Sequence, residues 1–396
     1  MKILIATDCY IFNMNGVTTC VLALCSALRR CGHEVRTLSL SNTNRSFRKG
    51  DDFFIRSFPA FYYPGMRISF AQKDPLLKEI ESWEPEVIHV HTDGSAYRMT
   101  LLIRKHKHIP LVKTCHTNYD YYVFGAFWRF PLFRALSRFA GERLYRTADK
   151  VTTPSPKLAH FPFLSSQRDR LVIVPNGIDL EKYRNRFSEK ERETFRKTLG
   201  ISGCTGVLVT ASRLSKEKNM REMISLFSDV LKRRQDVKYL IVGDGPDRKQ
   251  LKKMTEKLKI SSRVIFTGKV PSEDIWRYYA AGDIYVADST FEVHSMSYLE
   301  AMASGLPLLC RADDCLDGVL AHGINGLVWN SGEEFVDFAC RLLTEDSTRE
   351  EMGRCSLRKA ERFSADAFAS SMLRVYEAAI YEKQKHFSKE EEKHED

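Results

Sequence analysis

Two acidic residues, Glu292 and Glu300, have seven residues between them in the stretch STFEVHSMSYLEAMASG, residues 289–305. An apolar run over 283–287 predicts a buried strand just before this stretch, and the apolar spacing over 295–304 predicts a helix after the loop that carries Glu292. By helix rise the two carboxylates would lie about 12 Å apart, roughly the span of a sugar, a diphosphate and a ribose. One carboxylate could therefore bind sugar hydroxyls and the other ribose hydroxyls.

The start of the predicted helix is a candidate anion site. Free backbone N–H groups and the positive end of the helix dipole favour a phosphate there, at Ser295 or at His294 before it. The alternative is that Glu292 and Glu300 are solvated carboxylates of a loop and a helix. The motif by itself leaves both interpretations open, because short motifs match by chance.

Basic residues follow another predicted strand, over 206–211, in the loop SRLSKEKN at 212–219. Arg213 and Lys218 in this loop could clamp a diphosphate and stabilise it as a leaving group. Most charged clusters are solvated surface loops, and that interpretation also fits. The position of the loop directly after a strand favours the binding role.

Glycines at strand ends allow the backbone to approach a ligand closely. Gly16 and Val17 come after the predicted strand over 2–7, and Gly243 opens the turn GDGP after the strand over 237–242. Each glycine could also be required only for the geometry of its turn, and GDGP is a good turn sequence without any ligand. No GxGxxG occurs, so a nicotinamide or flavin cofactor is poorly supported.

Three histidines, His89, His91 and His116, stand at the ends of predicted strands in the first half of the chain. Two histidines two positions apart can bind a metal, but no carboxylate or cysteine completes a ligand set, so we expect no metal site. His116, in the segment KTCHTNYDYY, is the better candidate for a hydrogen bond to a ligand. A lone histidine is otherwise more often structural than catalytic.

The segment 119–146 interleaves aromatic residues and arginines against two acids, Asp120 and Glu142. From Pro131 on, arginines flank an apolar face, which suits a helix lying on anionic lipid with aromatic rings near the headgroups. The candidate membrane and acceptor contacts are Tyr121, Tyr122, Phe127, Trp128, Arg129, Arg134 and Arg138. A core helix with snorkelling arginines is the alternative. Nucleic acid is not expected as a partner, because stacking aromatics of single-strand binders usually lie on sheets.

Apolar runs predict the strands that would position these residues. In the first half they lie at 2–7, 34–40, 87–91, 111–115, 150–153 and 171–174, and in the second half at 206–211, 237–242, 264–267, 284–287, 307–310 and 326–329. Helical patterns separate most of them. This argues for an α/β protein with two doubly wound parallel sheets in tandem, and for a cleft that faces the carboxyl ends of both sheets.

The strand pattern breaks at PNGID, residues 175–179, and a highly charged stretch follows. We therefore expect domains at 1–175 and 176–365, a helix over about 366–382 that packs back on the first domain, and a disordered charged tail over 383–396. A chain of 396 residues is long for one core, so two domains are also the default from length.

The formal charge of +10 and the pI near 9.0 favour a polyanionic partner: nucleotide phosphates, an anionic membrane surface or nucleic acid. The ten cysteines are scattered without CxxC or zinc-ligand spacing, which is typical of reduced thiols in a cytosolic protein. No stretch approaches the length that spans a membrane, so we expect any membrane contact to be peripheral.

Taken together, these residues resemble the retaining glycosyltransferases of the GT-B fold, in the large group called family 4. The matching motifs are NGV at 15–17, HVHT at 89–92, the segment around His116, VPNGID at 174–179, SRLSKEKN at 212–219, GDGP at 243–246, FTGKVP at 266–271 and the Glu292–Glu300 pair before AMASGLP. Each motif is weak alone, but their order and spacing over the whole chain are highly specific. The resemblance implies two Rossmann-like domains facing a central cleft, with a nucleotide-sugar donor held mainly by the second and an acceptor by the first.

The resemblance also implies roles for individual residues. It assigns the diphosphate to Arg213, Lys218 and the backbone of Gly16, the ribose to Glu300, the donor sugar to Glu292 and His116, and the base to Lys269 and Val270. Val17, Gly243, Ser295 and Met296 complete the expected donor site, and His116, Glu292, Arg213 and Lys218 form the expected catalytic set. No metal or other cofactor is needed, because cations and helix ends stabilise the diphosphate.

Within the family, HTNYDYY followed by the aromatic–basic segment is similar to bacterial glycosyltransferases that add glucose or galactose to diacylglycerol. That similarity implies UDP-glucose as the donor, a membrane lipid as the acceptor, and a cytoplasmic enzyme held peripherally at the inner face of the cell membrane. The chain departs from the family at Val293, His294 and Ser295, where glycine or glutamine-glycine is usual, and at Asn15, where a double glycine would begin. The first departure bears on the identity of the sugar.

No carboxylate is obviously placed as a covalent nucleophile. We therefore expect the acceptor to attack from the same face as the leaving group, with retention of configuration, while a departing phosphate oxygen takes the acceptor's proton. Three alternatives stay open: a nucleotide-sugar epimerase of GT-B fold, a glycosyltransferase with a soluble acceptor, and a non-catalytic polyanion-binding protein. The last would explain the charge but not the ordered cleft residues.

Overall fold

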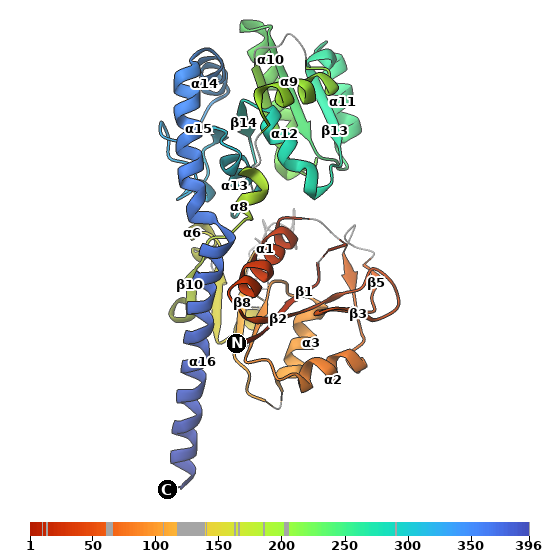
Figure 1. The fold of residues 1–396 in the computed structure, drawn as a ribbon, viewed down its shortest axis with the longest axis vertical. Helices are drawn as coiled ribbons and strands as arrows, with labels where there is room; N and C mark the ends of the chain where they lie inside the picture. Colours follow the sequence, from red (N-terminus) through yellow and green to blue (C-terminus); the bar gives the residue numbers. More distant parts are fainter. Residues whose placement is uncertain are drawn as a thin grey trace. The chain divides into compact units, whose positions relative to one another are not determined.

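The computed structural model describes residues 1–9, 11–12, 15–60, 66–105, 107–116, 139, 141–161, 164, 167–184, 187–201, 206–289 and 291–395. The chain divides into two compact units, which we call unit 1 (Met1–Gly177 with Ala365–Asp396) and unit 2 (Ile178–Ser364). The sequence places the boundary after residue 175, whereas the structure places it after Gly177. Figure 1 shows the elements of both units, and each unit is described separately below.

In the described part of unit 1, the main sheet has the strand order β10-β9-β8-β7-β1-β2-β4-β3. Its strands are β1 (Lys2–Thr7), β2 (Glu34–Leu40), β3 (Phe47–Lys49), β4 (Asp52–Ile55), β7 (Val87–Val90), β8 (Leu111–Thr114), β9 (Lys150–Thr153) and β10 (Leu171–Ile173). Neighbouring strands are parallel except for β3, which runs antiparallel to β4 at the edge. Each strand that the sequence predicts for this half is present.

Four short strands of unit 1 were not predicted. Besides β3 and β4, these are β5 (Phe58–Pro59) and β6 (Arg67–Ile68), which pair with each other in a separate small sheet. All three residues of β3 are exposed, and β5 and β6 have two residues each, so these three strands carry no readable apolar pattern. The short apolar run of β4 was missed, although its last three residues are buried. Their pairing is set by tertiary contacts.

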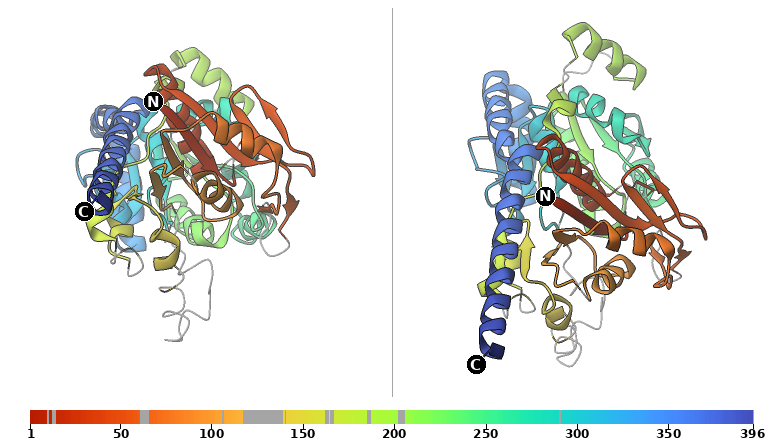
Figure 2. Two further views of the ribbon diagram at one scale, coloured as in Figure 1. Left: turned by 90° about the horizontal axis from the view of Figure 1, so that it is seen from below. Right: turned by 60° about the horizontal axis from the view of Figure 1, so that its bottom comes forward.

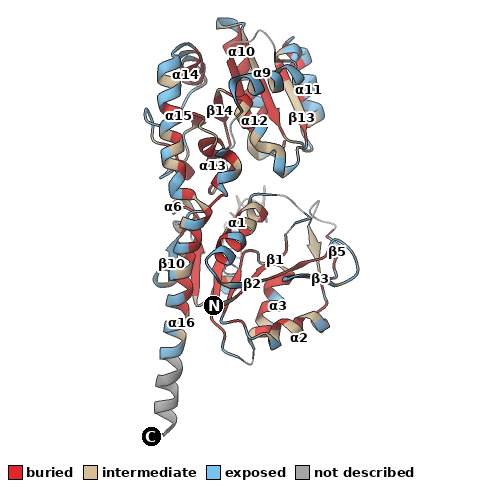
Figure 3. Cartoon of the chain, in the orientation of Figure 1, coloured by how far each residue is buried: buried red, intermediate tan, exposed pale blue. Residues whose placement is uncertain are grey.

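Helices cover both faces of the unit 1 sheet. They are α1 (Gly16–Arg30), α2 (Pro75–Ser82), α3 (Ser95–Arg104), α6 (Pro156–Ala159) and α16 (Ala365–Glu395). Successive side chains of a strand point to opposite faces. In β7, Ile88 and Val90 accordingly join a core cluster with residues of α2 and α3, whereas His89 between them bonds to Tyr376 of α16. The buried strands are visible in Figure 3.

Unit 2 contains a parallel sheet with the order β13-β12-β11-β14-β15-β16 among its described residues. Its strands are β11 (Gly206–Ala211), β12 (Val237–Val242), β13 (Val264–Gly268), β14 (Ile284–Ala287), β15 (Leu308–Arg311) and β16 (Gly326–Trp329). Its helices are α8 (Leu180–Arg184), α9 (Glu189–Thr198), α10 (Met220–Arg233), α11 (Arg248–Lys257), α12 (Ile275–Ala281), α13 (Met296–Ala303), α14 (Gly332–Thr344) and α15 (Asp346–Ala360).

The sheet of unit 2 also has helices on both faces. Ile284 and Val286 of β14 belong to a core cluster that includes Phe227 of α10. The ring of Tyr285, which lies between them in the strand, is 6.1 Å from the ring of Tyr279 in α12 and 5.8 Å from that of Tyr298 in α13. The doubly wound α/β architecture that the apolar runs predict is therefore confirmed in both units.

The C-terminal helix α16 is longer than the sequence predicts. The buried residues Phe368, Met372, Val375, Tyr376 and Ala379 follow helical spacing, and α16 packs on α1 and β8 of unit 1. Figure 2 shows it from two other sides as one continuous element. The prediction of a disordered tail after residue 382 was wrong, because the helix continues to Glu395. The tail is rich in Glu and Lys, which are good helix formers. Extending an existing helix avoids the unfavourable nucleation step that a separate helix would require.

No helix in the described ranges combines the length and the apolarity that a bilayer crossing requires.

The buried bond between α16 and the sheet gives a test of this packing. The hydroxyl of Tyr376 lies 2.7 Å from Nδ1 of His89, and both side chains are fully buried. Tyr376→Phe leaves the imidazole nitrogen without this partner, so we expect the free energy of unfolding to fall by about 1–3 kcal/mol in urea titrations. Tyr381→Phe on the same helix is the control, because this side chain is 65% exposed. Equal stability of the two variants would contradict the assigned packing.

Candidate functional site

Several predicted donor residues of unit 2 lie at one edge of its sheet. Because its strands are parallel, their carboxyl ends meet at that edge. The loop 212–219 follows β11, Gly243 follows β12, Lys269 and Val270 follow β13, and the loop with Glu292 follows β14. Residues far apart in the sequence are thus brought to neighbouring strand ends.

Lys218 and Glu292 form an ion pair at this edge. Their side chains are 23% and 13% exposed, so the pair is largely withdrawn from water. The structure therefore brings together two residues that the sequence singled out for separate reasons. Arg213 lies five positions before Lys218 in the same loop and is exposed.

Helix α13 begins and ends where the sequence predicts. It spans Met296–Ala303, with Ser295 as its N-cap residue, and Gly305 has a φ of +76°, in the left-handed region that suits the end of a helix. The Ser295 side chain makes no capping hydrogen bond, because its Oγ lies 3.1 Å from Oγ of Ser297. The first N–H groups of α13 are therefore not satisfied by the cap side chain and can be offered to an anion.

The glycine of the GDGP turn has a packing role. Gly243 has a φ of +132°, and a Cβ atom there would lie 1.9 Å from the carbonyl oxygen of Ser212. Gly245 approaches Leu214 as closely, since a Cβ atom would lie 2.3 Å from its carbonyl oxygen. The turn therefore packs directly against the loop that carries Arg213. The amide of Leu214 in that loop also donates a hydrogen bond of 3.0 Å to the carbonyl of Asp244. This contact explains both glycines without a ligand.

A buried carboxylate that the sequence analysis missed connects three of these segments. Asp288, at the end of β14, accepts a bond of 2.7 Å from Nδ2 of Asn219 and one of 3.1 Å from the guanidinium of Arg311. Burial raises the pKa of Asp288, although Arg311 and Asn219 act in the opposite direction. The sequence feature that could have indicated Asp288 is the position of an acidic residue directly after an apolar run. Asp288 positions Asn219, the residue next to Lys218.

Glu300 faces a different set of partners. The hydroxyl of Tyr279 donates to its Oε2 at 2.7 Å, and Tyr183 of α8 also donates to this carboxylate. Burial raises the pKa of Glu300 above its usual value of 4.5, while the two tyrosines and Lys182 lower it. The Glu300 side chain thus points into the protein, and no pattern in the sequence indicates its contact with the two tyrosines.

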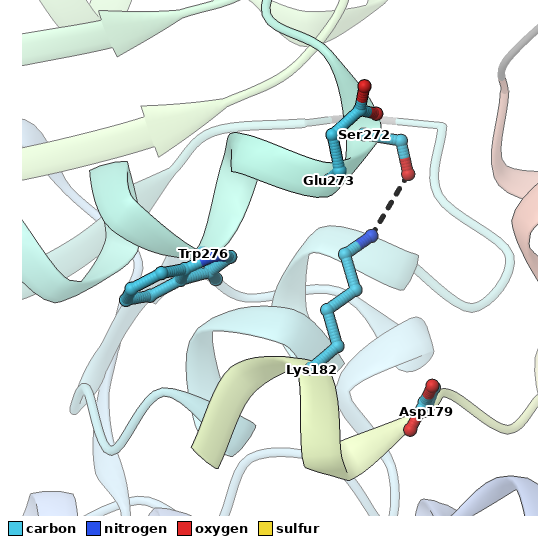
Figure 4. A pocket seen from close by; sticks show the side chains of 5 residues that line it. All are labelled: Asp179, Lys182, Ser272, Glu273 and Trp276. Atoms are coloured by element: carbon cyan, nitrogen blue, oxygen red, sulfur yellow. Dashed lines mark hydrogen bonds between the residues drawn. The ribbon is translucent and has the colours of Figure 1, made fainter. Parts of the chain in front are cut away.

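A pocket of ≈ 380 Å³ lies beside this cluster, between α8 and the start of α12. It is lined by Asp179, Lys182, Ser272, Glu273 and Trp276, and Figure 4 shows the Lys182 ammonium bonded to the Ser272 hydroxyl at 2.9 Å. Burial lowers the pKa of Lys182, although Glu300 and two other carboxylates raise it. An ammonium, carboxylates and an indole suit a ligand with hydroxyls and an aromatic ring.

His294, at the departure from the family pattern, is a buried residue of unit 2. Its ring lies 5.5 Å from that of Phe363, and its Nδ1 atom has no hydrogen-bond partner within the part of the chain described. Burial lowers its pKa to about 4, so the ring is neutral at neutral pH. The side chain therefore replaces a glycine with apolar packing and adds no positive charge beside Glu292.

Unit 1 has its own cluster at the carboxyl edge of its sheet. Nδ1 of His91, after β7, lies 2.9 Å from Nε2 of His116, after β8. His89 is bonded through Nδ1 to Tyr376 and through Nε2 to Thr114 at 2.6 Å. Burial lowers the pKa of His89 to about 3 and that of His91 well below its usual value, so both rings are neutral.

A cysteine does join these histidines. Cys20 of α1, His91 and His116 offer ligand atoms that all lie within 4.8 Å of one another. The expectation that no cysteine completes the set was therefore wrong. Cys20 is 71 positions before His91 in the sequence, and only the packing of α1 on the sheet brings them together.

Gly16 and Val17 form the first turn of α1, where Asn15 is the N-cap and its side chain accepts a bond of 3.0 Å from the amide of Thr18. The adjoining loop is held by Asp8, which accepts bonds from the amides of Gly94 and Ala96. The predicted membrane contacts lie outside the described residues. They are Tyr121, Tyr122, Phe127, Trp128, Arg129, Arg134 and Arg138.

Two family profiles match the chain, one on each half. The profile described as "Glycosyltransferase Family 4" matches residues 14–182, and the one described as "Glycosyl transferases group 1" matches residues 191–357. Between them they include Cys20, His91 and His116 of unit 1 and Lys218, Asp288, Glu292 and Glu300 of unit 2. The chain belongs to the glycosyltransferases.

Relatives of this glycosyltransferase include two lipid-modifying enzymes. The alpha-monoglucosyldiacylglycerol synthase of Acholeplasma laidlawii is 26% identical over 95% of this chain and 96% of its own length. The alpha-monoglucosyldiacylglycerol synthase of Streptococcus pneumoniae is 28% identical over 96% of this chain and 86% of its own length. The matched regions span both units in each case.

Solved structures agree on the fold. The Anabaena protein HepE in complex with UDP-glucose has a TM-score of 0.74 at 19% identity, covering 96% of this chain and all of that one. Sucrose-phosphate synthase from Thermosynechococcus elongatus has a TM-score of 0.75 at 16% identity, covering 96% of this chain and 99% of that one. The glycosyltransferase has the GT-B fold.

The buried carboxylate of Glu300 predicts a pH dependence of stability. Its pKa is raised in the folded state, so the folded protein binds more protons than the unfolded chain between the usual value of 4.5 and the raised value. The carboxylate form therefore destabilises the folded state at higher pH. We expect Glu300→Gln to increase the free energy of unfolding of the glycosyltransferase at about pH 8, and the gain to shrink as the pH falls towards about 4.5.

The measurement is urea unfolding at several pH values, with Glu193→Gln as the control. Glu193 is exposed on α9 and paired with Lys197, which lowers the pKa of the carboxyl, so its replacement removes a favourable charge and brings no such gain. A Glu300→Gln protein that is less stable than the wild type at neutral pH would show that the carboxylate is not a net cost.

Proposed function

We propose that this glycosyltransferase transfers glucose from UDP-glucose to diacylglycerol or a related membrane lipid, with retention of configuration at the sugar. The two synthases of glucosyldiacylglycerol among its relatives support the lipid acceptor. The observation that carries the proposal is the carboxyl edge of unit 2. There the cations of the loop 212–219, the open start of α13 and the carboxylate of Glu292 meet at adjacent strand ends.

The diphosphate of the donor is proposed to bind at Arg213, Lys218 and the amides at the start of α13, near Ser295 and Met296. Negative charge builds on this group as the bond to the sugar breaks, and preorganised cations and N–H groups stabilise it. A role on the diphosphate is also proposed for the backbone amides in the first turn of α1, at Gly16. No metal is required in this scheme.

The uridine is proposed to lie along the strand ends next to this diphosphate site. Lys269 and Val270 after β13 flank the base, and Glu300 accepts the ribose hydroxyls. The pocket beside Glu300 supports this assignment, since Lys182 and Trp276 suit a hydroxylated ligand with an aromatic base. Gly243 allows the turn after β12 to pack closely under the same site.

Glu292 is proposed to bind the glucose, and the role that the family resemblance gives to His116 is a contact with the donor sugar. Glu292 accepts sugar hydroxyls while its bond to Lys218 holds the carboxylate in place. Because Glu292 is neutralised by that ion pair, it is a poor nucleophile, which supports a same-face attack without a covalent intermediate. The acceptor oxygen bonds to the anomeric carbon, the bond from that carbon to the phosphate oxygen breaks, and the phosphate oxygen takes the acceptor's proton.

Membrane contact is proposed to involve unit 1. Residues 53–73 contain three cations, Arg56, Arg67 and Lys73, and no acid. In this stretch Phe58 pairs with Ile68 across β5 and β6, and Phe70 follows two positions after Ile68. Phe58 is 52% exposed and Phe70 is 75% exposed. Exposed aromatic rings close to basic residues in the sequence suit the interface of an anionic bilayer, and the inner face of the cell membrane is proposed as that surface.

The reaction is tested by incubating the protein with UDP-glucose, other nucleotide sugars and diacylglycerol, and by measuring the masses of the lipid products. We expect diacylglycerol to gain one hexose from UDP-glucose. Arg213→Ala should lower turnover about 10²–10³-fold, because one preorganised charge on the leaving diphosphate is lost.

Arg233→Ala is the matched control for Arg213. Arg233 lies at the end of α10 in the same unit and forms an exposed ion pair with Asp337, so its loss should leave turnover unchanged. An unchanged rate in Arg213→Ala removes this residue from the mechanism. A hexose transferred from another nucleotide sugar in preference to UDP-glucose refutes the proposed donor.

The lipid surface is tested by sedimentation with vesicles of anionic phospholipid. We expect the protein to sediment at low salt and to be released at high salt, because screening weakens the attraction between cations and headgroups. The double variant Phe58→Ser with Phe70→Ser should bind about tenfold more weakly, since two rings lose their apolar contact. Ile324→Ser in unit 2, at a side chain 58% exposed, should bind normally. Absence of binding at low salt would refute membrane contact.

A further inference from the structure

Three potential metal ligands meet where α1 passes the carboxyl ends of β7 and β8. Cys20 comes from α1, His91 follows β7 and His116 follows β8, and their ligand atoms all lie within 4.8 Å of one another. A tetrahedral zinc ion with bonds of about 2.3 Å to sulfur and 2.0–2.1 Å to nitrogen holds such atoms about 3.3–3.6 Å apart. Small side-chain adjustments would bring the three atoms to that spacing.

His91 carries a second, independent sign of a ligand. It is 2% exposed, its Nδ1 atom lies 2.9 Å from Nε2 of His116, and its Nε2 atom has no partner among the described residues. Buried polar atoms are nearly always satisfied in folded proteins. The neighbouring His89 follows that rule, since Tyr376 and Thr114 engage both of its nitrogens. His89 is therefore structural, whereas His91 keeps ligand capacity.

Cys20 supplies a soft ligand in the reduced state. Its thiol donates to Oδ1 of Asn176 at 3.2 Å, and the side chain is fully buried. Binding of a divalent cation would replace the S–H bond by a metal–thiolate bond and release one proton to solvent. Cys25, on the same helix and equally buried, belongs to no such cluster in the described structure.

We propose that Cys20, His91 and His116 form a binding site in unit 1 for a transition-metal cation of the Zn²⁺ class, with the fourth position open to water or a ligand. A set of one thiolate and two imidazoles suits zinc or cobalt, whereas magnesium and calcium prefer oxygen ligands. Three protein ligands and one open position are typical of exchangeable or reactive zinc sites and not of closed structural ones.

The site has a consequence that rests on the proposed function. His116 is proposed to contact the donor sugar. A metal ion bound to its imidazole would prevent that contact. Zn²⁺ is therefore an inhibitor of transfer that acts through unit 1. The metal site itself does not depend on this consequence, so each can fail separately.

Cobalt(II) is the probe for the site, because a cobalt–thiolate bond gives a charge-transfer band in the near ultraviolet. The full chain is stripped with a chelator under reducing conditions and titrated with Co²⁺. We expect the band to saturate at one cobalt per chain. Cys20→Ser should abolish the band and weaken binding at least about tenfold, and His91→Asn should weaken binding to a similar extent. Cys25→Ser is the control and should behave as the wild type.

Thermal unfolding separates lost ligands from lost folding. We expect Zn²⁺ to raise the unfolding temperature of the wild type and of Cys25→Ser, but not of Cys20→Ser, whose metal-free unfolding should resemble the wild type. The proposal is overturned if the wild type shows no thiolate band, or if Cys20→Ser binds cobalt as tightly as the wild type. Zinc binding without inhibition of transfer leaves the site standing and refutes the role given to His116.

Discussion

The site in unit 2 depends on the parallel direction of its strands. Each strand of a parallel sheet must be followed by a return through a helix, so the loops after the strands all begin at the same edge. Four of those loops supply Arg213, Gly243, Lys269 and Asp288, and Arg311 is the last residue of β15 at the same edge. Antiparallel pairing of any one strand would send its loop to the opposite edge and divide the set.

A buried carboxylate holds the segments at this edge in place relative to one another. Asp288 is withdrawn from water and engages Asn219 and Arg311, so the loops after β11 and β14 and the end of β15 are fixed to one another. A buried carboxylate is costly unless it is paired and hydrogen-bonded. The cost is offset here by two partners, and the result is a defined position for Lys218, which adjoins Asn219 in the chain. The ion pair between Lys218 and Glu292 also holds the loop before α13 in place.

The sequence predicted what depends on local pattern and missed what depends on tertiary contact. Apolar runs located the long strands of both sheets, and spacing with Gly305 located α13, because burial and chain reversal act on neighbouring residues. The tyrosines around Glu300 and the approach of Cys20 to His91 come from elements far apart in the chain. The helical end of α16 was missed for another reason. A charged composition is shared by disordered tails and by charged helices that continue a packed helix, so composition alone does not distinguish them.

Glu292 and Glu300 stand in one motif, yet their surroundings give them different chemistry. Glu292 has an ammonium partner that balances its charge, which agrees with the contact to sugar hydroxyls proposed for it. Glu300 has neutral phenol donors, and burial raises its pKa. A carboxylate held by phenols gains strongly from any further donor, because each new hydrogen bond stabilises a charge that is poorly solvated. The proposed pair of ribose hydroxyls would supply such donors. The motif thus holds one charge-balanced carboxylate and one that is poorly solvated, and this difference agrees with the separate roles proposed for them, Glu292 on the sugar and Glu300 on the ribose.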